Sequence, residues 1–291
     1  MGEALGIAAA VMFGASHFFN GVLSRRVPAL GIAVYSQAGG AVFFLGWGLA
    51  VFWGRGEVEP MGQGDAGWAV LSGVGAAVGV AALYEGMSRA HIAVVVPVTS
   101  IVSVAVPFIL SVSLLHEPLQ LYTAVAGVML LPAIWLLSRP PRHSIADQAT
   151  PDTRQGVAAV SFGLVAGAGY ATQLFALSQI TTVAPAEPLL TGQLVSLVML
   201  LGLAWVRGTS LKLRSSTGLG AAVGVMAAVA MAFYLFATRH ALLGPVMIAI
   251  ALYPALPVIL AVLLLKERLS RLQAAGLLIA AIVVPVVSLN S

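Results

Sequence analysis

The sequence has no cysteine, only two lysines and few charged residues of either sign. Without cysteine, the chain cannot form disulfides or bind a metal through thiolates. Charged residues make up 8% of its 291 residues, against about 25% in a typical soluble domain. The composition therefore excludes an ordinary soluble globular domain.

Motifs that carry common catalytic chemistry are also missing. The sequence has no G-x-x-x-x-G-K-[ST] phosphate-binding loop, so we expect no ATP hydrolysis by this chain. It has no H-E-x-x-H motif and no histidine cluster with metal-ligand spacing, so we expect no metal site and no cofactor. The basic residues do not cluster on one soluble face, which argues against a nucleic-acid partner. We predict that the protein is not an enzyme.

Long apolar runs dominate the chain. Hydrophobic residues make up 60% of the sequence, and the mean hydropathy is +1.01. A helix that crosses a bilayer needs about 20 mostly apolar residues. The sequence therefore predicts an all-α integral membrane protein with ten transmembrane helices. We expect them at 4–23, 30–53, 67–87, 94–115, 121–137, 156–178, 185–206, 218–237, 244–265 and 272–289.

The basic residues fall mainly on one side of the predicted bundle. Of the 14 Lys and Arg residues, all but Arg55 and Arg239 lie in loops that follow odd-numbered spans. Cytoplasmic loops of membrane proteins are enriched in Lys and Arg. We therefore expect both termini outside the cytoplasm, in a bacterial-type inner (plasma) membrane.

The two halves of the chain are similar to each other. The motifs HEPLQ, at 116–120, and KERLS, at 266–270, each lie between two apolar runs, and the same 150-residue shift aligns other residues. It pairs Gly6 with Gly156, Tyr84 with Tyr234, Arg89 with Arg239, Pro107 with Pro257 and Glu117 with Glu267. Because five spans is an odd number, the second half must enter the membrane in the opposite direction. We predict two inverted five-helix repeats, 1–137 and 156–291, joined by a cytoplasmic linker at 138–155.

The halves also share a longer signature. The stretch LLLKERLSRLQAAGLLIAAIVV, at 263–284, and its first-half counterpart at 83–119 place a glutamate-bearing turn after an apolar span. This signature resembles EamA-type members of the drug/metabolite transporter superfamily. Within it, the chain is most similar to ten-helix amino-acid exporters, including the YddG-like exporters of aromatic amino acids. The resemblance implies alternating access between two inverted halves.

Polar residues within the apolar spans are candidates for a binding site. Polar groups are costly in hydrocarbon, so they should face a neighbouring helix or a watery cavity. His17 and Asn20 lie on one face of the first span, and the repeat pairs Asn20 with Tyr170, one turn before Gln173. These side chains either line a cavity or only bond a neighbouring helix. Tyr84 and Tyr234 fit either a cavity or an interfacial aromatic belt.

Two mid-span prolines, Pro107 and Pro257, lack the N–H that would bond the carbonyl four residues earlier. Those carbonyls belong to Ser103 and Tyr253. Either the free carbonyls accept hydrogen bonds from a substrate ammonium, or the prolines only kink the helices and so shape a cavity. We predict Pro107 and Pro257 as helix kinks. The predicted substrate-binding residues are His17, Asn20, Tyr84, Ser103, Tyr170, Gln173, Tyr234 and Tyr253.

The acidic residues near span ends have structural interpretations. We expect Glu117, Glu267 and Glu187 at the start of the spans that follow them, where a carboxylate suits the free N–H groups of a helix. Glu85 lies one turn before Arg89 and is expected to pair with it.

The spans contain no deep Lys or Arg, which argues against anionic substrates such as phosphates. We predict a secondary transporter, an exporter or facilitator, of small amphipathic metabolites. Zwitterionic amino acids, aromatic ones included, are the favoured substrates, and the protein is a monomer or homodimer. One alternative is an exporter of drugs or other metabolites with proton coupling, although the first span has no carboxylate after Glu3. An alternative of another class is a membrane enzyme that acts on lipid-linked substrates.

Overall fold

The computed structural model describes residues 1–24, 28–55, 61–90, 92–137, 153–211, 215–266 and 270–290. In these ranges the chain is helical throughout, apart from short turns, and has no strand. The helices are α1 (Gly2–Ser24), α2 (Ala29–Arg55), α3 (Gln63–Arg89), α4 (Ile92–Ser113), α5 (Leu121–Leu137), α6 (Thr153–Ser178), α7 (Ala186–Val206), α8 (Ser215–His240), α9 (Leu243–Ile250), α10 (Ala255–Leu265) and α11 (Arg271–Asn290).

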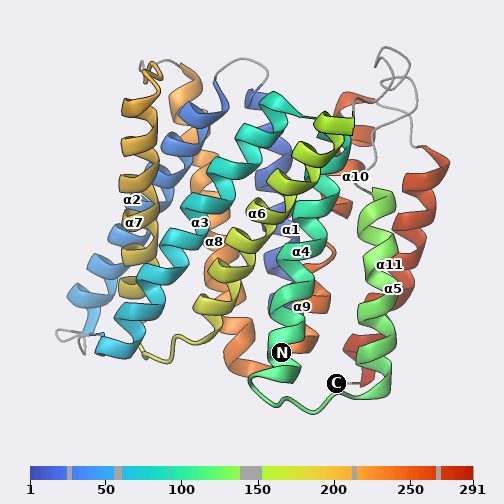
Figure 1. The fold of residues 1–291 in the computed structure, drawn as a ribbon. Coiled ribbons are helices and arrows are strands. Elements are labelled where there is room, and N and C mark those ends of the chain that lie inside the picture. The colour runs from blue at the N-terminus through green and yellow to red at the C-terminus, as the bar shows by residue number, and fades with distance from the viewer. Residues whose placement is uncertain are drawn as a thin grey trace.

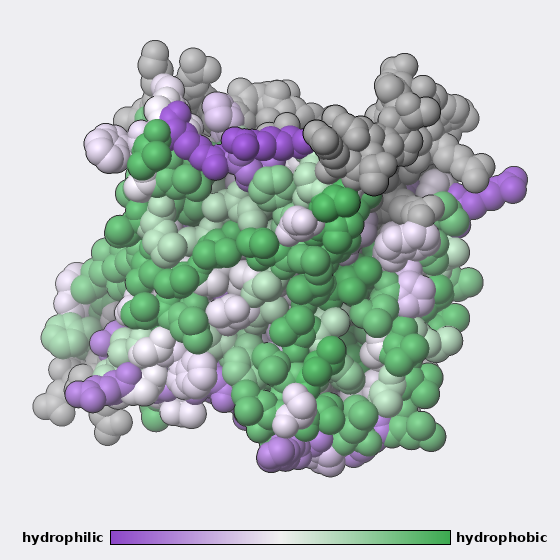
Figure 2. All heavy atoms as spheres, viewed as in Figure 1, coloured by the Kyte–Doolittle hydropathy of each residue, from purple (hydrophilic) through white to green (hydrophobic). Residues whose placement is uncertain are grey.

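In the described ranges, eight helical segments are long and apolar enough to cross a membrane. The apolar helices at Leu121–Leu137 and Arg271–Val283 are shorter. Figure 2 shows hydrophobic side chains over the middle of the visible face and hydrophilic ones gathered at both ends of the bundle. The chain is a multi-pass membrane protein. The predicted span at 244–265 is interrupted, because α9 ends at Ile250 and α10 begins at Ala255.

The two ends of the bundle differ, and we name them by their residues. Figure 1 shows the N- and C-terminal ends of the chain at the same end of the bundle, next to the α4–α5 loop at 114–120. We call this the terminal end. The opposite end carries Arg89, the last residue of α3, and Arg207, which follows α7. We call it the arginine end.

The helix pairs of the bundle follow a regular pattern. Helix α3 packs along α6, and α8 packs along α1; likewise α4 packs against α6, and α9 and α10 pack against α1. Helix α2 contacts α8, and α3 contacts α7. Helices α5 and α11 form a pair of their own, seen beside the main bundle in Figure 1. The 150-residue shift converts the α3–α6 contact into the α8–α1 contact, and the α4–α6 contact into the contact of α9 and α10 with α1. It likewise converts the α2–α8 contact into the α7–α3 contact.

Glycines make the close helix contacts possible. A Cβ added to Gly75 on α3 would lie 2.6 Å from the carbonyl oxygen of Gly169 on α6. A Cβ on Gly163 of α6 would lie 2.7 Å from the Cβ of Val98 on α4. Small residues at such positions let helix backbones approach in a membrane, where van der Waals packing drives association. Helix α6 is thereby held tightly between α3 and α4.

Candidate functional site

A cavity of about 370 Å³ lies inside the bundle, within the size range of small-molecule sites. Its walls come from both halves of the chain, chiefly from α1, α2, α3, α4, α6 and the α9–α10 turn. On α3 the lining residues run from Ala76 to Met87, two residues before Arg89. On α2 they begin at Ala33, near the same end of the bundle. The cavity therefore extends from the middle of the bundle toward the arginine end.

The lining combines apolar side chains with uncharged polar ones. Among the described residues that form it, none is Asp, Glu, Lys or Arg. Hydroxyl, amide, imidazole and phenol groups face the space between apolar side chains. The polar and aromatic lining residues are Phe13, Ser16, His17, Asn20, Ser36, Gln37, Tyr84, Thr99, Ser100, Ser103, Tyr170, Gln173, Gln193 and Tyr253. Such a lining suits a neutral or zwitterionic molecule, because a net ionic ligand would need a charged partner.

Most of the residues predicted as a binding site meet at this cavity. Seven of them line it: His17, Asn20, Tyr84, Ser103, Tyr170, Gln173 and Tyr253. Helix α1 supplies the first two, and α6 supplies Tyr170 and Gln173 one turn apart. Whether these side chains bind a substrate stays a prediction.

Tyr234 does not belong with them. Its side chain is fully buried, and its hydroxyl donates a hydrogen bond to the carbonyl of Leu174 at 2.9 Å. The sulfur of Met247 lies 3.8 Å from the same hydroxyl. The repeat shift pairs Tyr234 with Tyr84, but only Tyr84 lines the cavity. Tyr234 instead packs in the core of the terminal end.

The predicted kinks differ between the two prolines. Pro107 lies inside the continuous helix α4. Pro257 lies in the first turn of α10, where a helix does not need the missing N–H. The interruption of the ninth span falls before it, at 251–254, where Tyr253 N–H bonds the carbonyl of Ile250 at 2.9 Å. This turn places the Tyr253 side chain on the cavity wall.

His17 is held in a defined orientation. Its Nδ1 lies 2.8 Å from the carbonyl oxygen of Phe13, one turn earlier on α1. Its ring packs against the ring of Tyr253, with centroids 5.3 Å apart and planes tilted by 47°. Helix α1 and the α9–α10 turn thus meet through these two side chains at the cavity wall.

The sequence reasoning missed a buried amide network between α2 and α7. Gln37 donates to the hydroxyl of Ser196 at 2.7 Å, and Gln193 donates to the side-chain oxygen of Gln37. Both glutamines border the cavity. A glutamine within each of two apolar spans could have predicted polar contacts in the bundle, since buried amides need hydrogen-bond partners. That the two glutamines pair with each other could not be predicted, because it depends on the packing of α2 against α7.

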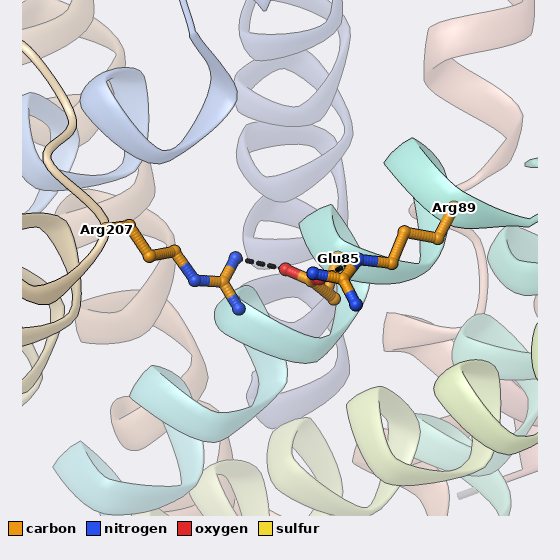
Figure 3. Close-up of polar contacts among 3 residues, drawn as sticks. All are labelled: Glu85, Arg89 and Arg207. Atoms are coloured by element: carbon orange, nitrogen blue, oxygen red, sulfur yellow. Dashed lines mark hydrogen bonds and ion pairs between the residues drawn. The ribbon is translucent and has the colours of Figure 1, made fainter.

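An ion-pair cluster lies at the arginine end. Figure 3 shows Glu85 of α3 between the guanidinium groups of Arg89 and Arg207. The predicted pair of Glu85 with Arg89 is confirmed. Arg207 comes from the end of α7, 122 residues away in sequence, so its part could not be predicted. The cluster ties α3 to α7 beside Tyr84.

The terminal end is closed by an apolar core. Leu177, Ile180, Tyr234, Leu235, Met247 and Ile248 are each at most 2% exposed. The carboxylate of Asp65 at the start of α3 accepts the backbone N–H groups of Thr181 and Thr182, at 2.9 and 2.7 Å. Arg239 donates to the carbonyl of Thr182 at 2.5 Å. These bonds fasten the α6–α7 loop to α3 and α8.

Glu117 also acts at this end, but not where it was predicted. It precedes α5 by four residues, and its carboxylate accepts the N–H groups of Leu243 and Gly244, at 2.7 and 2.9 Å. It therefore caps α9 rather than α5, because the α4–α5 loop lies against that helix start. Glu187 lies in the first turn of α7, as predicted. Glu267 and most of the predicted linker, 138–152, lie outside the described residues.

Fold and cavity together define a class: a multi-pass helical membrane protein with a polar, uncharged cavity inside the bundle. Residues 1–139 match the EamA-like transporter family. No curated protein matches the chain. A solved structure described as "Crystal structure of protein" is 15% identical, covers 99% of this chain and 96% of its own, and superposes with a TM-score of 0.76. At that identity, the likeness shows a shared fold alone.

Proposed function

We propose that the protein is a secondary transporter that carries a small zwitterionic amino acid, aromatic ones included, by alternating access. The observation that carries this proposal is the mid-bundle cavity, whose lining is polar and uncharged and which is closed at one end. The match of residues 1–139 to a transporter family supports the general class. The resemblance to YddG-like exporters supports the particular substrate.

The chemistry of the lining fits a zwitterion. Amide and hydroxyl groups of Asn20, Gln173 and Ser103 can both donate and accept hydrogen bonds, as an ammonium and a carboxylate together require. The faces of Tyr84, Tyr170 and Tyr253 offer surfaces for an apolar or aromatic side chain. Charged partners are not needed when the ligand has no net charge.

The mechanism rests on two inverted five-helix repeats, 1–137 and 156–291. The contacts of α3 with α6 and of α8 with α1 are interchanged by the 150-residue shift, as are those of α2 with α8 and of α7 with α3. Two similar halves of opposite direction can exchange conformations about a central site. The lining residues of the cavity reach toward the arginine end, and a buried apolar core lies at the terminal end. The proposed state is therefore one that opens at the arginine end.

The cellular orientation follows from the Lys and Arg bias. If that bias places the arginine end in the cytoplasm of a bacterial-type cell, the cavity faces inward and both termini lie outside. A cavity that faces inward can load a substrate for export. We propose no ATP, cofactor or second protein for this step, and either a monomer or a homodimer can carry it out.

Transport by purified protein in liposomes tests the proposal. Labelled amino acids, with phenylalanine and tryptophan among them, should cross the membrane without ATP. Asn20→Ala should lower the flux about tenfold through loss of a hydrogen bond to a charged group. The protein should stay folded, because Ser36, which lies 3.3 Å from Asn20 Oδ1 as its donor, can also donate to the Gly220 carbonyl at 3.1 Å. Flux equal to that of protein-free liposomes for every amino acid would refute the proposal.

Export of drug-like cations with proton coupling is not favoured by the cavity, because no carboxylate is found among its described lining residues. A membrane enzyme is not favoured either. In the part of the chain that the structure describes, no group of three His, Asp or Glu side chains could hold a metal ion.

A further inference from the structure

The hydrogen bond of His17 fixes which of its ring nitrogens carries a proton. Nδ1 lies 2.8 Å from the carbonyl oxygen of Phe13, and a carbonyl oxygen has no hydrogen to give. Nδ1 must therefore be the donor. In the neutral ring the proton is then absent from Nε2, which becomes a hydrogen-bond acceptor. The accessible His17 side chain presents this acceptor at the cavity wall.

A contact from another element, the α9–α10 turn, helps to hold the ring in place. The ring of Tyr253 packs against it at 5.3 Å between centroids. Tyr253 lies beside α4, where Ser100 and Ser103 also line the cavity. Because the Phe13 carbonyl and the Tyr253 ring both contact the imidazole, Nε2 is a preorganised acceptor rather than a mobile one.

The described surroundings of Nε2 favour a cation. Within the described ranges, no protein group donates a hydrogen bond to Nε2. Tyr84 and Tyr253 both lie close enough to Tyr170 to interact with it electrostatically, so three phenol rings gather on this side of the cavity. An ammonium group has N–H donors for Nε2 and is attracted to the faces of aromatic rings. A carboxylate has neither property.

The geometry points to His17 as the residue that binds the ammonium group of the substrate, through Nε2 and beside the ring of Tyr253. This inference rests on the proposed transport function and deepens it. It assigns primary amines to the site as the essential ligand class, with the carboxylate of an amino acid held elsewhere in the cavity. An amine without a carboxylate should therefore bind through His17, but more weakly than the zwitterion, because the described lining has no charged partner for its net charge. Acids without an amine should not depend on His17.

The assignment has a consequence for pH. Protonation of His17 places a hydrogen on Nε2 and a positive charge beside the ammonium, so acid on the cavity side should weaken binding. The titratable groups that line the cavity with His17, among the described residues, are Tyr84, Tyr170 and Tyr253. The charged residues on the helices around the cavity lie at the bundle ends, as Arg239 does on α8 and Glu85 on α3.

Two substitutions separate the acceptor from the rest of the ring. In His17→Asn, the short amide can still donate to the Phe13 carbonyl but has no atom at the position of Nε2. In His17→Gln, the longer amide can place an oxygen there and cannot be protonated near neutral pH. His240→Asn is the matched control, because His240 Nδ1 also lies 2.8 Å from the carbonyl four residues earlier, that of Phe236, outside the cavity.

The experiment measures binding of three probes to purified protein by ligand-induced thermal stabilisation, and flux in liposomes beside it. The probes are phenylalanine, phenethylamine, which lacks the carboxylate, and 3-phenylpropionate, which lacks the amine. His17→Asn should weaken binding of both amines about tenfold, as expected for a lost hydrogen bond to a charged group, and leave 3-phenylpropionate unaffected. His17→Gln should restore amine binding and remove its decline in acid. His240→Asn should match wild type.

Three results would overturn the inference: equal amine binding by wild type and His17→Asn, an equal loss for 3-phenylpropionate, or no amine binding by wild type. The proposed function fails in a different way. If wild type binds the amines through His17 but carries none of them across the liposome membrane, the site stands and transport does not.

Discussion

The two ends of the bundle are built from the same helices but in opposite ways. Toward the arginine end, α1, α3 and α4 present polar side chains to a cavity, and the charged residues Glu85, Arg89 and Arg207 pair with one another beside it. Toward the terminal end, α6, α8 and α9 bury an apolar core. There, the carboxylates bond to backbone N–H groups of other elements instead.

The difference shows where the structure is fixed and where it is accessible. A carboxylate that accepts two backbone N–H groups with a closed core behind it holds loops and helix starts in one place. At the arginine end, the guanidinium groups of Arg89 and Arg207 are 68% and 44% exposed, although Glu85 is only 10% exposed. Ion pairs with such exposed partners contribute little to stability. Opening the terminal end would therefore break the carboxylate–backbone hydrogen bonds and the core there. A rearrangement of the arginine end would disturb only the weaker ion pairs of Glu85. Substitutions at each end can test this ranking.

The largest effect is expected at the terminal end from Asp65→Ala. This change leaves the N–H groups of Thr181 and Thr182 without their acceptor, at a cost of about 3 kcal/mol for two charge-assisted hydrogen bonds. The melting temperature in detergent should fall accordingly. Glu187→Gln is the control, because Glu187 accepts one exposed N–H, that of Met61, at 3.1 Å. An equal, small shift in both variants would mean that Asp65 does not hold this end closed.

A smaller loss is expected from Gly75→Ala at the contact of α3 with α6. The added methyl would lie 2.6 Å from the carbonyl oxygen of Gly169, and overpacking of this kind costs about 1–3 kcal/mol. The same change at Gly202 on α7 meets nothing within 4 Å. Thermal unfolding should show a lowered midpoint for Gly75→Ala alone. An unaltered midpoint would contradict the close packing of these two helices.

Tyr234→Phe should have a modest effect that separates the core from the cavity. It removes the hydroxyl that donates to the Leu174 carbonyl at 2.9 Å, which should cost about 1 kcal/mol. Because Tyr234 does not border the cavity, substrate affinity should stay unchanged. Binding of phenylalanine, followed by thermal stabilisation, checks this against Tyr84→Ala, which should weaken it. A clear loss of affinity in Tyr234→Phe would return Tyr234 to the site.

The smallest effect is expected at the arginine end from Arg207→Gln. The Arg207 side chain is 44% exposed, and exposed ion pairs contribute about 0–1 kcal/mol. Arg89 remains to pair with Glu85. The melting temperature should change little, and any change should shrink in high salt. A loss as large as that of Asp65→Ala would show that this cluster, not the terminal end, fixes the structure.

Apolar runs predicted most of the fold, because a bilayer imposes the length and hydrophobicity of each spanning helix. The expected span at 94–115 agrees closely with α4, which is Ile92–Ser113. The interruption of the ninth span lies at 251–254, whereas the kink was predicted at Pro257. Pro257 was the residue considered, but Pro254 precedes the second helix and lies at its N-cap. A proline is tolerated in the first turn of a helix, so Pro257 does not interrupt α10. The break lies before α10, next to Pro254.

The candidate site was predictable in part for a similar reason. A polar residue in an apolar span must face something other than lipid, and this placed His17, Asn20 and Tyr170 on a shared space. It does not say whether that space is a cavity or a packed core, so Tyr234 was grouped with them. The contacts of Glu85 with Arg207 and of Glu117 with the start of α9 could not be predicted either. Such contacts depend on which helices pack together, which the local pattern does not encode.

One measurement tests the central claim, that the cavity is accessible from the arginine end and closed at the terminal end. Because the chain has no cysteine, single-cysteine variants have no background reaction with a thiol reagent. Val80→Cys lines the cavity, and Ile180→Cys lies in the closed core at 2% exposure. In liposomes, a membrane-impermeant maleimide should label Val80→Cys only from the arginine side and should leave Ile180→Cys unlabelled from either side without substrate. Labelling of Ile180→Cys from the terminal side at the rate of Val80→Cys, or a Val80→Cys that reacts only from that side, would contradict the account.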